Sequence, residues 1–156
     1  MLWYRTPRRR KLRFGSYEQI LSEVDRLAPA HRTLGNWTLA QICEHLFETQ
    51  TFSVEPWEPE IRTSRLFQAT IGRIALCVLL WFRFIPEQQG NLGPRPPVDL
   101  QAARGHLNES IRRLSSEPTC ARHPIFGGMT AAQWRQFHLH HAAHHLSFVI
   151  PECSRP

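Results

Sequence analysis

The sequence lacks clusters of cysteine, because its four cysteines are far apart. They are Cys43, Cys77, Cys120 and Cys153, and no two of them form a C-x-x-C pair. Disulfide frameworks and thiolate zinc sites need cysteines at short, regular spacings. The sequence therefore argues against both, and a reducing, cytoplasmic environment is the default expectation.

Long apolar runs are also missing. The longest one, residues 74–82, lies between Arg73 and Arg83 and is far shorter than the ~20 residues needed to span a bilayer. We expect it to form a buried core helix, or an apolar interface in a homodimer if that helix is exposed. No apolar run follows the arginines at the start of the chain, so no secretory signal is predicted.

Acidic residues are absent before Glu18, whereas basic residues gather there. The basic residues of this stretch are Arg5, Arg8, Arg9, Arg10, Lys11 and Arg13. A basic arm over residues 1–15 could contact nucleic acid or anionic lipid. We favour a solvated or docked terminus over a nucleic-acid partner, because Leu12 and Phe14 could pack the arm onto the domain.

The polar–apolar alternation of a half-buried strand is missing along the whole chain. Helix starts, in contrast, are marked by capping boxes at Ser16, Thr38 and Thr130, and by Asp99. We expect helices over residues 16–28, 38–52, 99–114 and 130–150, with a further helical stretch over 61–84. The sequence thus predicts an all-α fold, a four-helix bundle with an extra inserted helix, in one domain over residues 16–151.

Histidines gather in the last predicted helix, where five of the nine lie between His138 and His145. At ~100° per residue, His138, His141 and His145 fall on the apolar side, and His140 and His144 fall on a polar arc near solvent. Histidines at i and i+4, such as His141 and His145, can chelate one metal ion. They can equally be buried with hydrogen bonds to water or backbone, and their spacing alone does not decide between the two.

A catalytic metal site commonly has three protein ligands and one open position. The candidate for the third ligand is His45, which follows the cap at Thr38 by seven residues and lies at the edge of an apolar stripe. His106 competes with it on helical-wheel arguments. Glu44 and Glu48 are interpreted as surface charges.

The order of these motifs resembles that of the DinB-like proteins. Their second-helix signature, a Trp followed eight residues later by His, resembles residues 35–46, and their last-helix H-x-x-x-H resembles residues 141–145. Residues 9–14, 123–127 and 145–148 narrow the resemblance to an uncharacterised DinB-like branch, common in bacteria and known only as a domain of unknown function. The resemblance covers residues 9–148.

The resemblance implies a divalent metal ion held by His45, His141 and His145. Imidazole ligands favour zinc or nickel, with iron as a further choice. It also implies a metal-dependent enzyme, a thiol-dependent transferase or a hydrolase, that acts on an unidentified small molecule. His138 would then orient a ligand or shuttle protons, unless it only packs in the core.

One departure from the better-known relatives limits what carries over. They often have Arg and Gly after the last His, whereas this chain has Leu146 and Ser147. Contacts to a thiol substrate are therefore not inferred from them. The alternative function is a non-catalytic bundle that is stabilised by metal or that binds a small ligand.

Overall fold

The computed structural model describes residues 9–55, 63–82, 95–119 and 122–152. Its elements are α1 (Tyr17–Leu27), β1 (His31–Thr33), α2 (Leu39–Val54), α3 (Arg65–Phe67), the π-helix η1 (Gln68–Gly72), α4 (Arg73–Phe82), α5 (Leu100–Ser116), α6 (Ala131–Leu146) and β2 (Val149–Pro151). The predicted all-α fold is confirmed. The inserted helical stretch is described from residue 63 to 82, and its other predicted residues lie outside the described part of the chain.

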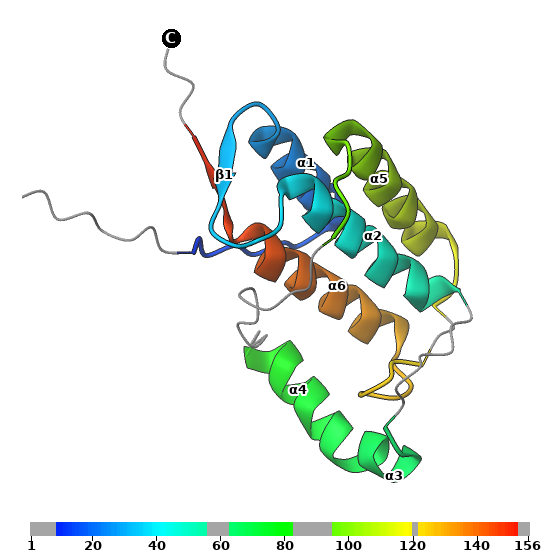
Figure 1. The fold of residues 1–156 in the computed structure, drawn as a ribbon. Helices are drawn as coiled ribbons and strands as arrows, with labels where there is room; N and C mark the ends of the chain where they lie inside the picture. Colours follow the sequence, from blue (N-terminus) through cyan, green and yellow to red (C-terminus); the bar gives the residue numbers. More distant parts are fainter. Residues whose placement is uncertain (1–8, 56–62, 83–94, 120–121, 153–156) are drawn as a thin grey trace, which may run out of the picture.

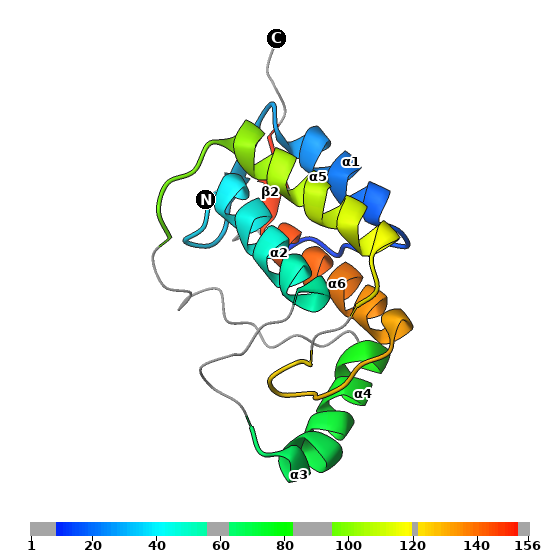
Figure 2. The same ribbon diagram turned by 90° about the vertical axis from the view of Figure 1, so that its right-hand side faces the viewer.

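Helices α1, α2, α5 and α6 form a bundle, and α4 lies against α6 on the side away from α5 (Figure 1). Turned by 90°, the same view shows α2 and α5 side by side, with α6 beside α2 (Figure 2). Helix α6 is therefore placed between the rest of the bundle and α4. This central position decides the surroundings of the histidines that it carries.

The larger core cluster fills the space between the four bundle helices. Its buried side chains recur every three or four residues on each helix, as the apolar stripe of an amphipathic helix requires. They include Ile20, Val24 and Leu27 of α1, Leu39, Ile42, Cys43 and Leu46 of α2, Ala103, Leu107 and Ile111 of α5, and Leu139, Ala142 and Leu146 of α6.

A second, smaller core cluster joins α4 to α6. It consists of Leu76, Leu79, Phe126, Trp134 and Phe137. Three aromatic rings in one cluster bury a large apolar area for few residues. This cluster fixes both α4 and the loop before α6 on the face of α6 that the bundle leaves uncovered.

Two of the three predicted capping boxes are confirmed in full. The hydroxyls of Thr38 and Thr130 each accept a hydrogen bond from the backbone N–H three residues on, at 3.2 Å. Ser16 is the N-cap of α1, as predicted, but its side chain makes no capping hydrogen bond. Instead, Gln19 Oε1 accepts a hydrogen bond from Gly15 N at 2.6 Å, one residue earlier than the box requires.

The last helix is shorter than predicted, because it ends at Leu146 and not at residue 150. The chain then pairs antiparallel with β1, with Arg32 opposite Ile150. Each strand has only three residues, too few to show the alternation by which strands are recognised in a sequence. We predicted no strands from the sequence, and this prediction is wrong at β1 and β2.

The described part of the basic arm, residues 9–14, is docked on the bundle. Arg10 N donates to Ser147 O at 2.9 Å, and the Arg10 guanidinium forms an ion pair with Glu23 at 2.6 Å. Leu12 and Phe14 pack against the larger core cluster. Figure 2 shows this segment in dark blue as it runs alongside α6 to the start of α1. Residues 1–8 lie outside the described part.

Helix α4 is only half buried, so our prediction of a fully buried core helix over residues 74–82 is wrong in part. Leu76 and Leu79 face the second core cluster, whereas Ile74 and Trp81 are 66% and 82% exposed. No helix within the described residues has the length and apolar character needed to cross a bilayer.

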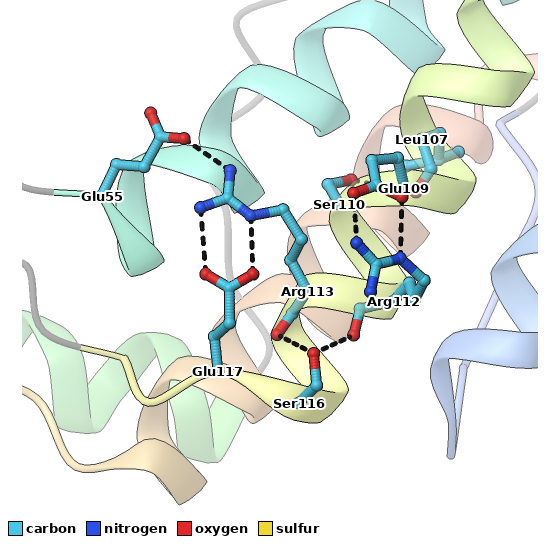
Figure 3. Close-up of polar contacts among 8 residues, drawn as sticks. All are labelled: Glu55, Leu107, Glu109, Ser110, Arg112, Arg113, Ser116 and Glu117. Atoms are coloured by element: carbon cyan, nitrogen blue, oxygen red, sulfur yellow. Dashed lines mark hydrogen bonds and ion pairs between the residues drawn. The ribbon is translucent and has the colours of Figure 1, made fainter.

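The ends of α2 and α5 are tied together at the surface by one arginine (Figure 3). Arg113 donates in a bidentate manner to the carboxylate of Glu117, at 2.9 and 3.0 Å, and also pairs with Glu55 at the end of α2. A guanidinium can serve two carboxylates because its five N–H groups point in fixed directions.

Gly72 is the closest approach between η1 and the loop that precedes α6, which makes it a sensitive test of this packing. A Cβ at residue 72 would lie 2.3 Å from the backbone oxygen of Ile125. We expect Gly72→Ala to lower the free energy of unfolding by ~1–3 kcal/mol, because the loop must move away. Urea unfolding measures the effect.

Gly105 provides the matched control. It lies in α5 with no atom within 4 Å of a built Cβ. Gly105→Ala should therefore stabilise the protein by ~0.5–1 kcal/mol through helix propensity. Equal effects of the two substitutions would show that the loop is not packed on η1 as described.

Candidate metal centre

Helices α2 and α6 bring three histidines together at one point. His45 extends from α2, and His141 and His145 extend from successive turns of α6. The Nε2 atom of His141 lies 3.2 Å from Nε2 of His45 and 3.0 Å from Nε2 of His145. The ligand atoms that the three residues offer all lie within 4.8 Å of one another. We call these three residues the histidine triad.

The triad is set into the protein and has little charge of its own at neutral pH. Burial and then the nearby charge of Arg95 lower the pKa of His45 to about 4. Burial is also the largest cause that lowers the pKa of His145, to about 2, and that holds the pKa of His141 well below its usual range. All three imidazoles are therefore neutral at pH 7, the form in which histidine binds metal ions.

The contacts inside the triad do not satisfy its nitrogen atoms. An imidazole nitrogen offers either one hydrogen or one lone pair, so His141 Nε2 completes only one of its two short contacts as a hydrogen bond. The Nδ1 atoms of His141 and His145 are buried and have no hydrogen-bond partner among the described residues. The short Nε2 contact that is not a hydrogen bond leaves a buried nitrogen unpaired, at a cost of ~1–3 kcal/mol, and this cost favours a ligand at the Nε2 atoms.

One side of the triad is covered by a tryptophan. The Trp37 ring lies 5.0 Å from the His45 ring and stacks on His145 at 5.9 Å. The Arg95 guanidinium lies over Trp37 at 4.8 Å and pairs with Glu48 at 2.6 Å. Arg95 also reaches the triad itself, because its Nη2 atom lies 3.4 Å from Nδ1 of His45.

Two other histidines, His106 and His31, lie outside the triad. His106, which competed with His45 for the third position, pairs with Glu44 at 2.6 Å and is half exposed. His31 Nδ1 contacts Leu27 O at 2.8 Å. Neither histidine belongs to a group of three possible ligands within the described residues. His45 is the histidine that α2 places against α6.

His138 is fully buried but faces a different partner. Its Nε2 atom lies 3.0 Å from the hydroxyl oxygen of Ser53, and that hydroxyl donates to Gln50 O at 2.7 Å. His138 Nε2 must therefore donate the hydrogen of the first contact. The ring also stacks on Trp134 at 5.4 Å. These contacts tie α6 to α2 one turn away from the triad.

The family of the chain follows from a comparison with family models. The model described as "Protein of unknown function (DUF1569)" matches residues 6–152. The chain belongs to this family. No curated protein and no solved structure matches it. Membership of the DUF1569 family states no activity, and the resemblance to DinB-like proteins stays a prediction.

The structure corrects the helical wheel at two histidines of this DUF1569 chain. His140 and His144 were expected near solvent, but they are 8% and 7% exposed. The docked segment 9–14 covers this side of α6, and Arg9 lies 3.5 Å from His144 Nδ1. A wheel compares residues within one helix, so it cannot show that another part of the chain packs on the polar arc.

His123 is a half-buried histidine whose aromatic surroundings were not predicted from the sequence. Its ring packs on Phe126 at 4.2 Å and meets Phe137 at 5.5 Å, and burial lowers its pKa to about 4. The only signal in the sequence was the run at residues 123–127, which carried part of the family resemblance.

The burial of His138 predicts a specific dependence of stability on pH. Burial lowers the pKa of His138 to about 3. Below pH ~6.5 the unfolded chain takes up this proton and the folded chain does not, so stability falls by ~1.4 kcal/mol per pH unit down to about pH 3. His138→Leu removes this loss at the cost of one hydrogen bond, ~1 kcal/mol.

The variant should therefore be less stable than the wild type at pH 7 and more stable at pH 5, as measured by urea unfolding. Leu139→Ala is the control, because it should lower stability by ~2–5 kcal/mol at each pH. Parallel pH curves for wild type and His138→Leu would contradict a neutral buried imidazole at residue 138.

Proposed function

We propose that the protein is a metal-dependent enzyme of DinB-like type. In this proposal His45, His141 and His145 hold one divalent ion, and the reaction is a group transfer to or from a thiol, or a hydrolysis, on a small molecule. The observation that carries it is the convergence of three neutral Nε2 atoms from two helices.

The spacing of the triad suits an ion. In a tetrahedral zinc site with bonds of ~2.0–2.1 Å, neighbouring ligand atoms lie ~3.3 Å apart. The two measured Nε2–Nε2 distances, 3.2 and 3.0 Å, are close to this value. The three Nε2 atoms cannot all form hydrogen bonds with one another, and a bound ion would give each of them a partner.

The type of ligand narrows the choice of ion. Three imidazoles and no carboxylate form the ligand group, which favours zinc or nickel, with iron as a third choice, over magnesium or calcium. When bound to neutral ligands, such an ion keeps its full charge and lowers the pKa of a water molecule or a thiol at its open position.

The surrounding residues have positioning roles in this proposal. The two triad members on α6 share one helical face, so the helix itself fixes their separation. Trp37 packs over His45 and His145 and limits the access of water from that side. His138 holds α6 against α2 through its contact with Ser53.

A second candidate function rests on the same cluster. The triad joins α2 to α6, and His145 is only 5% exposed. An ion that links two helices in this way stabilises the folded state whether or not it takes part in a reaction. The protein would then be a metal-stabilised or ligand-binding bundle.

Metal analysis of protein purified without a histidine tag tests the triad. The wild type should contain about one divalent ion per chain, and His45→Ala and His141→Ala should each lower this at least tenfold. His31→Ala is the control, since His31 lies outside the triad. Stoichiometric metal in either triad variant would contradict the assignment.

Turnover separates the enzyme from the metal-stabilised bundle. Wild type, chelator-treated and zinc- or nickel-reloaded protein are assayed with a panel of low-molecular-weight thiols and electrophiles, and with activated esters and amides. The enzyme should lose turnover on chelation and regain it on reloading. If chelation lowers the melting temperature but no turnover is found in any state, the stabilising role is the correct one.

A further inference from the structure

The histidine triad occupies one end of a seam between α2 and α6, and the seam continues beyond it. On α2, Thr49 and Phe52 follow His45 at i+4 and i+7, on the same face of the helix. On α6, Phe137 and Trp134 precede His141 at i−4 and i−7. Because a helical turn rises ~5.4 Å, the two pairs lie one and two turns from the triad.

These four residues line a pocket with a volume of about 180 Å³. The remaining wall comes from residues 122–124 of the loop before α6. This loop is fixed from outside, because Gln68 Nε2 donates to Pro124 O at 2.9 Å and Gly72 lies against the backbone of Ile125. The pocket is therefore built from two helices and a loop that η1 holds in place.

The pocket and the triad share a wall. The Phe137 ring stacks on the His141 ring, with centroids 5.5 Å apart, and meets the His123 ring on its other side, also at 5.5 Å. On α2, the Thr49 hydroxyl donates to the backbone oxygen of His45 at 2.6 Å. A molecule seated in the pocket is thus one residue layer from the triad.

The walls are mainly aromatic, and most of the polar groups that accompany them are hydrogen-bond donors. The exception is the Thr49 hydroxyl, which uses its proton for His45 O and can therefore only accept from a ligand. His123 Nδ1 accepts hydrogen bonds from the backbone N–H groups of Ile125 and Phe126, at 3.2 and 3.3 Å. Its ring proton therefore resides on Nε2. Trp134 is 4% exposed, and its indole N–H has no hydrogen-bond partner within the described residues.

The charged side chain at the pocket is also a donor. Arg122 lines it, and no carboxylate of the described residues does. Arg122 is exposed, so its guanidinium can donate to a lone pair of a ligand that enters the pocket. An occupant with an acceptor group therefore suits the pocket better than an aliphatic chain or a cation.

We propose that this pocket binds a single aromatic ring, or an apolar group of that size, that carries a hydrogen-bond acceptor. A dry apolar cavity of ~150 Å³ holds benzene, so the volume suits one ring and not two. This inference rests on the proposed function. In it, the pocket selects substrates with such a ring and directs the rest of the molecule along the seam to His45 and His141.

Phenol is the probe, and its affinity is measured by ligand-observed NMR titration. For so small a ligand we expect a dissociation constant on the order of 1 mM. Thr49→Phe should fill the pocket and weaken binding at least tenfold, whereas Thr49→Val keeps the shape of the threonine and should bind phenol within about twofold of the wild type.

Phe52→Ala provides a second variant at the rim of the pocket. Phe52 is 36% exposed, so its removal should leave the fold intact and weaken phenol binding. Circular dichroism and urea unfolding establish that each variant is folded. The proposed pocket is wrong if the wild type does not bind phenol. It is also wrong if Thr49→Phe and Phe52→Ala both bind phenol as tightly as the wild type does.

Cobalt loading tests the link between pocket and triad. With Co²⁺ in place of Zn²⁺, the protons of bound phenol should relax faster, because the ring lies within about two helical turns of the triad. Equal relaxation in Co²⁺- and Zn²⁺-loaded protein would place the phenol elsewhere. If the protein binds phenol but no metal, the proposed function is wrong and the pocket is confirmed. If it binds metal but no phenol, the pocket is wrong and the proposed metal site is unaffected.

Discussion

The desolvation of imidazoles along α6 is the constraint on which the rest of the structure depends. His138, His140, His144 and His145 are each less than a tenth exposed on this one helix. A buried imidazole is kept neutral because charge is costly away from water, and a neutral imidazole still has one donor and one acceptor to be satisfied. Each of these rings must therefore find a neighbour, and the neighbours come from distant parts of the chain.

Three parts of the chain that pack around α6 supply these neighbours. The bundle provides His45 and Ser53 from α2, the docked segment 9–14 covers His140 and His144, and α4 with the loop before α6 covers Trp134 and Phe137. The basic arm thus has a structural use that its charge alone did not suggest. Its inward residues pack on the core, and its backbone is bonded to the end of α6.

Much of this was predictable from local signals. The caps at Thr38 and Thr130 and the i, i+4 pair at His141 and His145 depend on a few neighbouring residues, which is why the sequence alone identified them. The burial of His140 and the two short strands depend on segments more than a hundred residues apart in the chain. No helical period records such contacts. His45 was identified by its place at the edge of a stripe together with the family resemblance.

A metal site of three imidazoles would not by itself determine a reaction, because an ion with an open position activates water and thiols alike. The choice between them has to come from residues that hold the substrate. In this chain the seam between α2 and α6 provides both parts, the Nε2 atoms at one end and an aromatic pocket with donor groups at the other. Phe137 lines the pocket and stacks on the ring of His141, and Thr49 lines the pocket and donates to the backbone oxygen of His45. In the proposed function, these two residues would couple the recognition of a substrate to the chemistry at the triad.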